Sequence, residues 1–218
     1  MIIPSGKKHV VWARIAKTGS MSTERTLTAL GVFMPLRNVL RRREAYKPNK
    51  HILVVDDLGK LADVGVNVDD CFIFTIVRSP YSRAMSAWCG HTFFKEKNRD
   101  NFADCIRNPP QRPDKGYREL GNKKEKAIEG AWRHFTKTMS QSTSIDGALR
   151  VDRIIKLEDY KNGLTAVLEE LGFKKIKFFK ENKSRFRKKR DLKPEEIRLI
   201  NANYSEDFDN FKYEKKEG

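Results

Sequence analysis

Two segments of this chain share one pattern, and that pattern restricts its fold more than any other feature. Residues 12–22 and 72–86 each run from an apolar stretch into a polar turn and then into a helical pattern. Each turn carries a cation and small hydroxyl residues near the helix start. Main-chain N–H groups at a helix N-terminus favour negative charge. The sequence therefore predicts two anion cradles on neighbouring strands, suited to a ligand with two separate phosphate-like groups.

Apolar stretches alternate with helical patterns along the rest of the chain. Buried strands are predicted at 8–15, 51–55, 72–77 and 152–157. Helices are predicted at 20–30, 123–139, 158–171 and 194–204, with Pro80 opening a further one. This alternation predicts an α/β fold, a P-loop-like three-layer arrangement with a central, mainly parallel sheet flanked by helices. We expect one domain over residues 1–218.

Composition narrows the function classes further. The formal net charge of +16 favours polyanionic partners without choosing between nucleic acid, anionic lipid, acidic glycan and a phosphorylated cofactor. No run approaches the roughly 18 apolar residues of a membrane span, and the first residues lack the apolar core of a signal peptide. We therefore expect a cytoplasmic protein without a transmembrane segment. Cys71, Cys89 and Cys105 form no CxxC pair and are predicted to be free thiols, and no metal-ligand spacing occurs.

The two turns resemble those of a known family, the sulfotransferases that use 3′-phosphoadenosine 5′-phosphosulfate (PAPS), and most closely the carbohydrate sulfotransferases. Residues 16–22 resemble the family's Pro-Lys-Thr-Gly-Ser-Thr-Ser turn. Residues 77–86 resemble its Val-Arg-Asn-Pro-Tyr-Asp-Arg-Leu-Val-Ser segment. Weaker likenesses spread over most of the remaining chain, at 132–135, 155–160, 171–172, 181–184 and 204–213.

This resemblance implies transfer of a sulfuryl group from PAPS to an acceptor hydroxyl, most readily that of a glycan, with PAP as the product. The transition state is loose and carries its charge on peripheral oxygens, as in phosphoryl transfer. Catalysis then depends mostly on placement and electrostatics. No metal is expected, because protein cations already surround the charge.

The resemblance also assigns the first turn to the 5′-phosphate side of PAPS. Lys17 would neutralise the leaving 5′-phosphate. N–H and hydroxyl donors would come from Thr18, Gly19, Ser20 and Ser22. Met21 stands where the family has a threonine, and Ala16 where it has a proline. The donor contact of that threonine would therefore pass to a neighbouring serine or to the main chain.

The second turn is assigned to the 3′-phosphate. Arg78 would hold it with a forked guanidinium, and Ser86 would add a hydroxyl from the same helix. A basic segment near the end of the chain would close over this phosphate, through Asn182, Ser184 and Arg185.

An acceptor hydroxyl needs a base, and imidazole titrates near neutrality. His51 is the first candidate, because family members place a histidine before the second turn. His134 is the second candidate. Glu24 and Glu44 stay open, since other branches of the family use a glutamate.

Two other function classes stay open at this point. Residues 52–57 resemble a Walker B strand, which would suit a P-loop kinase or NTPase, but G-x-x-x-x-G-K-[ST] is missing. Residues 174–190 interleave aromatic and basic residues as single-strand nucleic-acid binders do, although a track for an anionic glycan fits the same pattern. We expect nucleic acid to be the less favoured partner. The acceptor and the oligomeric state stay open.

Overall fold

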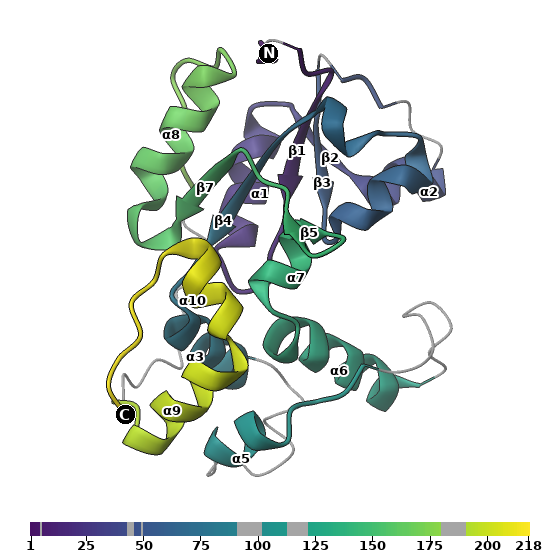
Figure 1. Cartoon of the computed structure of the whole chain (residues 1–218). Helices are drawn as coiled ribbons and strands as arrows, with labels where there is room; N and C mark the ends of the chain where they lie inside the picture. Colours follow the sequence, from purple (N-terminus) through teal and green to yellow (C-terminus); the bar gives the residue numbers. More distant parts are fainter. Residues whose placement is uncertain (5, 43–45, 49, 91–101, 113–121, 180–190) are drawn as a thin grey trace. The chain divides into compact units, whose positions relative to one another are not determined.

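The computed structural model describes residues 1–4, 6–42, 46–48, 50–90, 102–112, 122–179 and 191–218 (Figure 1). The chain divides into two compact units. Unit 1 comprises Met1–Val77 and Met139–Lys183, and unit 2 comprises Arg78–Thr138 and Ser184–Gly218. The two units are compact parts of the chain, and one domain over residues 1–218 stays a prediction.

Unit 1 is built on a five-stranded sheet with the order β2-β3-β1-β4-β7. Every neighbouring pair is parallel. The strands are β1 (His9–Ala13), β2 (Phe33–Pro35), β3 (Ile52–Val55), β4 (Cys71–Val77) and β7 (Arg153–Lys156). The predicted α/β fold with a parallel central sheet is confirmed. The sequence pattern missed β2, because three residues are too few to show a period.

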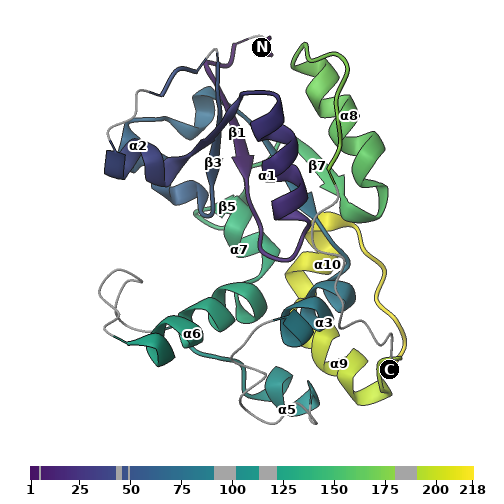
Figure 2. The same cartoon turned by 180° about the vertical axis from the view of Figure 1, so that it is seen from behind.

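Helices cover both faces of this sheet (Figures 1 and 2). One face packs against α1 (Ser20–Ala29) and α8 (Tyr160–Glu170), which follows the short turn η4 (Leu157–Asp159). The other face packs against α2 (Leu36–Arg42) and η1 (Leu58–Val64). Three short elements complete unit 1: η2 (Val68–Asp70), α7 (Met139–Thr143) and the hairpin of β5 (Ser144–Ile145) with β6 (Ala148–Leu149). The three-layer arrangement is confirmed.

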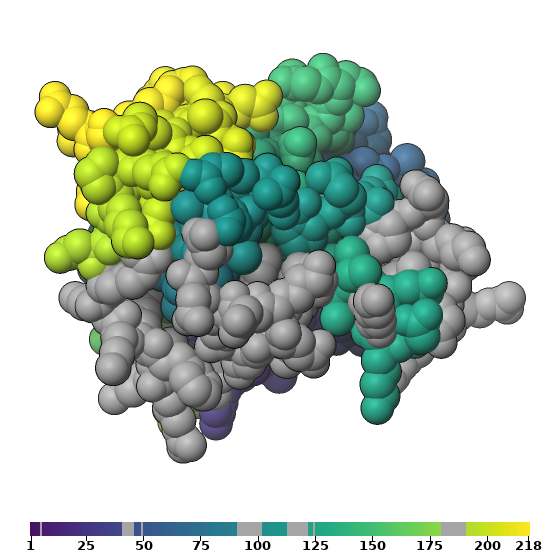
Figure 3. All heavy atoms as spheres, turned by 90° about the horizontal axis from the view of Figure 1, so that it is seen from below, coloured from purple at the N-terminus to yellow at the C-terminus, as the bar shows by residue number. Residues whose placement is uncertain are grey.

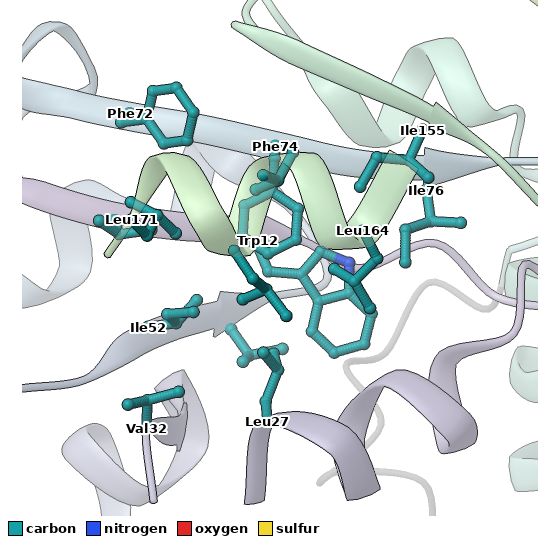
Figure 4. Packing of buried hydrophobic residues seen from close by; sticks show 14 residues of the cluster. Trp12, Leu27, Val32, Ile52, Phe72, Phe74, Ile76, Ile155, Leu164 and Leu171 are labelled. Atoms are coloured by element: carbon teal, nitrogen blue, oxygen red, sulfur yellow. The ribbon is translucent and has the colours of Figure 1, made fainter. Parts of the chain in front are cut away.

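The strands of unit 1 are apolar on both faces, as a sheet covered on both sides requires. Val10 and Trp12 point to the α1 and α8 side, and Val11 and Ala13 to the other. Trp12 stacks on Phe74 of the neighbouring strand, with ring centroids 6.5 Å apart (Figure 4). In the strand register Ala13 pairs with Thr75, so β1 ends at the level of Thr75 and β4 continues to Val77, where the second candidate turn begins.

Unit 2 is helical in its described part. Its elements are α3 (Pro80–Gly90), α5 (Phe102–Arg107), α6 (Lys123–Ala131), η3 (Trp132–Thr136), α9 (Pro194–Asn203) and α10 (Ser205–Phe211). Their shared core includes Tyr81, Phe102, Phe135, Tyr204 and Phe208. Figure 3 shows the yellow-green α9 against the teal segment that holds α5. The sequence pattern did not predict α5 or α10.

One predicted helix of the chain proves to be interrupted. Instead of a continuous helix over 123–139, α6 ends at Ala131 and the next turn, η3, has π-helical hydrogen bonding. Lys137 then leaves the helix with an extended backbone, its N–H bonded to the Trp132 carbonyl at 2.9 Å. Met139 already belongs to α7 of unit 1. An amphipathic period continues through such a change of winding, so the pattern alone does not reveal it.

The cysteines are free thiols, as predicted. Cys71 is buried at the start of β4, and burial raises the pKa of its thiol to about 12. It is therefore a small apolar core residue and no nucleophile near neutral pH. Within the described residues, no helix has the length and apolar character needed to cross a membrane.

Candidate functional site

The first turn connects β1 to α1 and contains two left-handed residues. Lys17 has φ of 71° and Gly19 has φ of 86°. The left-handed backbone favours glycine at position 19, and a Cβ added there would lie 2.8 Å from Cδ1 of Leu157, whose side chain would have to shift. The left-handed conformation is costly for a lysine, and such strain concentrates at functional sites.

Two hydroxyls hold this turn from within. Thr18 Oγ1 and Ser20 Oγ both donate to the carbonyl of Ile15, at 2.9 and 2.7 Å. Thr18 is buried, and Ser20 is half-buried. The structure therefore shows these hydroxyls shaping the turn, a use that the sequence pattern did not predict.

The turn ends at the first residues of α1. The N-cap, Gly19, contributes no side chain to the first turn of this ten-residue helix, and that turn contains no acidic residue. Met21 is 54% exposed there, and Ser22 is half-buried. The positive end of the helix dipole is thus not neutralised by a carboxylate within this turn.

Arg14 anchors the start of the same turn, and sequence reasoning gave it no role. Its Nε and Nη2 donate to the two carboxylate oxygens of Asp56 at 2.6 and 2.9 Å, and its Nη1 donates to Glu24. Burial lowers the pKa of Arg14, but the two carboxylates more than offset this and raise it. Arg14 thus ties the end of β1 to the end of β3 and to α1. A charged residue directly after a buried strand was the available signal.

The second turn follows β4, which ends at Val77. Arg78 and Ser79 are half-buried, and α3 begins at Pro80 as predicted. The N–H of Arg83 bonds to the Ser79 carbonyl at 2.8 Å and closes the first helical turn. Ser86 lies on the same helix, half-buried. Because β1 and β4 are adjacent and parallel, the residues after Ala13 and after Val77 both leave the sheet at the carboxyl ends of the strands.

The first candidate base, His51, lies at the amino ends of the strands, the end of the sheet opposite to the two turns. It directly precedes β3, whose Ile52 pairs with Val10 of β1. The strands need about 13 Å to run from this level to their carboxyl ends, where the Lys17 turn begins. Nδ1 of His51 is buried, and its main-chain N–H bonds to the Lys47 carbonyl at 3.0 Å. The structure does not bring His51 beside Lys17.

The second candidate base, His134, lies in the π-helical turn η3 of unit 2. Two buried side chains hold carbonyls that follow His134 in the chain: Tyr204 Oη donates to the carbonyl of Phe135 at 2.6 Å, and Arg83 Nη2 donates to that of Lys137 at 2.6 Å. Burial raises the pKa of the Tyr204 hydroxyl, which keeps it a proton donor. Single π-helical turns occur often at functional sites.

The other predicted site residues are placed as follows. Glu24 is paired with Arg14. Glu44, Asn182, Ser184 and Arg185 lie outside the described residues.

The acidic residues after β3 do not form a metal site in the described part of the chain. Asp56 pairs with Arg14, and Asp57 caps η1 by accepting the N–H of Gly59 at 3.2 Å. No group of three or more His, Cys, Asp or Glu side chains able to hold a metal gathers there. Asp56 and Asp57 thus have structural partners that a Walker B interpretation does not predict.

Comparison with protein-family models finds a match over residues 1–214, and the matching model describes the sulfotransferase family. This chain belongs to the sulfotransferase family. A search of curated protein sequences finds no significant match. The matched residues span both units, so the sulfotransferase assignment includes the Lys17 turn and the Arg78 turn. It confirms the predicted family and supports sulfuryl transfer over the kinase and nucleic-acid alternatives.

Proposed function

We propose that this sulfotransferase takes the sulfuryl group from PAPS and passes it to an acceptor hydroxyl, leaving PAP. The observation that carries the proposal is the first turn: a left-handed lysine and a left-handed glycine at the start of a helix without an acidic residue in its first turn. Such a turn directs main-chain N–H groups and a cation at an anion. PAPS supplies a sulfuryl group attached to a phosphate leaving group.

Lys17 would stabilise the charge that grows on the 5′-phosphate as its bond to sulfur breaks. The hydroxyls of Thr18 and Ser20 bond to Ile15, so these residues would contribute main-chain N–H groups to the phosphate. Gly19, Met21 and Ser22 complete the proposed 5′-phosphate contacts. Arg14 would keep the turn in place through its bonds to Asp56 and Glu24.

The Arg78 turn would hold the 3′-phosphate, a group that does not react. Arg78 offers a forked guanidinium, and Ser86 offers a hydroxyl. Asn182, Ser184 and Arg185 stay predicted contacts of the same phosphate. Because β1 and β4 are adjacent parallel strands, both turns start at the carboxyl ends of the strands, as a two-phosphate ligand requires.

The acceptor oxygen would form its bond to sulfur while its proton passes to a base. We assign that proton to His134 rather than His51, since His51 lies at the amino ends of the strands and Glu24 is paired with Arg14. Glu44 stays the alternative base. Arg83 and Tyr204 would fix the turn that carries the imidazole. A glycan hydroxyl is the proposed acceptor, and the net charge of +16 suits an acidic one.

Ligand binding tests the donor. PAP should raise the melting temperature without magnesium. At 100 times its dissociation constant, it should stabilise the folded protein by about 2.7 kcal/mol. ATP with magnesium should not. Absence of any shift with millimolar PAP would overturn the donor assignment. A screen for transfer of labelled sulfate from PAPS to glycans, lipids and phenols would then identify the acceptor.

Two histidine variants test the base. With saturating PAPS, His134→Ala should lose about 10²–10⁴-fold in turnover and keep its affinity for PAP. His51→Ala should stay active. An inactive His51→Ala enzyme beside an active His134→Ala enzyme would return the role to His51. If both variants stayed active, the acceptor would need neither imidazole.

A further inference from the structure

Three hydrogen bonds form a closed cycle between Tyr81 in the first turn of α3, Asn201 of α9 and Lys216 near the end of the chain. Tyr81 Oη donates to Oδ1 of Asn201. The N–H of Lys216 donates to Tyr81 Oη at 2.7 Å, and Asn201 Nδ2 donates to the Lys216 carbonyl at 2.9 Å. Both main-chain groups of Lys216 are used, and one tyrosine hydroxyl connects them to α3.

Packing holds the Tyr81 ring in the same place. The Lys216 ammonium lies 5.5 Å from the ring centroid, and the Phe208 ring meets it edge-on with centroids 5.1 Å apart. Tyr81 is only 6% exposed, whereas Lys216 is exposed. In Figure 3 the yellow residues at the end of the chain lie on the surface beside α9. A buried helix residue is thus clamped by a segment at the surface.

The clamp acts close to the proposed 3′-phosphate contact. Tyr81 directly follows Pro80, the first residue of α3, and Arg78 stands just before the helix. Packed interiors have few voids, so a shift of the Tyr81 ring moves the turn to which it belongs. Bidentate recognition of a phosphate by arginine depends on direction as well as on charge.

We propose that Tyr81, Asn201 and Lys216 are positioning residues for the Arg78 turn. They fix the first turn of α3 so that Arg78 and Ser86 meet the 3′-phosphate of the nucleotide in a bound geometry that is already formed. This inference rests on the proposed function. The ligand class is a nucleotide with a phosphate on its 3′ oxygen, and the clamp contributes to affinity for that group alone.

Two variants remove the hydrogen bond between the Lys216 N–H and the Tyr81 hydroxyl from opposite sides, and the tyrosine variant also removes the bond to Asn201. Tyr81→Phe removes the hydroxyl and keeps the ring against Phe208, and Lys216→Pro removes the N–H donor. Lys216→Ala is the matched control, since it keeps the N–H. The measurements are calorimetric dissociation constants for PAP and for adenosine 5′-phosphate, turnover at saturating PAPS, and the melting temperature.

We expect both Tyr81→Phe and Lys216→Pro to bind PAP about three- to tenfold more weakly, a change typical of losing one hydrogen bond. Adenosine 5′-phosphate, which lacks the 3′-phosphate, should bind as to the wild type, and turnover at saturation should stay the same. Lys216→Ala should stay within about twofold of wild type for PAP. The double variant should be no weaker than the weaker single one, because both remove the same bond.

Two results would overturn the inference: equal loss of affinity for both nucleotides, or a lower melting temperature with unchanged PAP affinity. The clamp would then have a structural role only. Either result would leave the proposed function intact, provided that the wild type binds PAP. A wild type that does not bind PAP would instead overturn the proposed donor, and the inference with it.

Discussion

The Lys17 turn and the Arg78 turn follow neighbouring strands and are held in different ways. The Lys17 turn is shaped by its own main chain, with two left-handed residues and two hydroxyls bonded to the Ile15 carbonyl. The Arg78 turn is held by side chains further along α3, since Tyr81 and Arg83 reach other parts of unit 2. The difference follows from the sequence: one turn has a glycine at its centre, and the other passes directly into a helix through Pro80.

This comparison indicates that the two turns should respond to different changes. A turn defined by its backbone is sensitive to substitutions that alter φ or fill space within it. A turn defined by distant side chains is sensitive to the loss of a bond outside it. Substitutions at Lys17, Arg78 and Gly19 test this contrast directly, and changes at Arg83 and His9 test the packing around it.

The largest effect should separate the two cations. Lys17→Ala should lower turnover by about 10²–10³-fold, because a preorganised charge no longer meets the leaving phosphate. Arg78→Ala should mainly raise the dissociation constant for PAP, because its phosphate does not react. Steady-state kinetics and calorimetry measure both, with Lys8→Ala, an exposed lysine paired with Asp70, as the control. The reverse pattern would exchange the two assignments.

The next effect concerns the buried guanidinium of unit 2. Arg83→Met should lower the free energy of unfolding by about 3 kcal/mol, because a charged donor to the Lys137 carbonyl is lost from the interior. Denaturant unfolding measures this, and Ser82→Ala on the exposed side of α3 is the control. A loss as small as that of the control would show that packing alone holds the η3 segment.

A smaller effect should appear at the glycine of the first turn. Gly19→Ala should cost about 2 kcal/mol, from its left-handed backbone and from the contact with Leu157, and should weaken PAP binding. Gly31→Ala is a matched control: its φ is also positive at 71°, but nothing lies within 4 Å of an added Cβ. The control should lose about 1 kcal/mol and bind PAP normally. Equal effects on PAP binding would contradict a turn defined by its own backbone.

The smallest effect concerns pH. Burial lowers the pKa of His9, whose ring stacks on Tyr46 at 5.7 Å. Below about pH 6.5 the unfolded chain therefore binds more protons than the folded one, and the free energy of unfolding falls as pH drops. His9→Phe keeps the stacking and cannot titrate, so its stability should change less between about pH 5 and 7.5. Parallel profiles for the two proteins would disprove the contribution of His9.

Much of unit 1 could be predicted from the sequence, because its strands are continuous apolar runs that end in turn residues. The stretch that includes β4 stood out in this way, and Pro80 gave the start of α3 correctly. The π-helical turn at His134 could not be predicted, since it preserves the amphipathic period of α6. β2 and α10 were missed because short elements show too little of any period.

The sequence by itself indicated the family and the positions of the two turns, because each apolar run breaks at a cation and small hydroxyl residues just before a helix. Only the tertiary structure decided which side chains support them. The pairing of Arg14 with Asp56 joins residues 42 positions apart, and that of Tyr81 with Asn201 joins residues 120 apart. Strand register likewise placed His51 at the amino end of β3, away from the Lys17 turn. Such relations depend on how strands and helices pack, and no local pattern of residues carries that information.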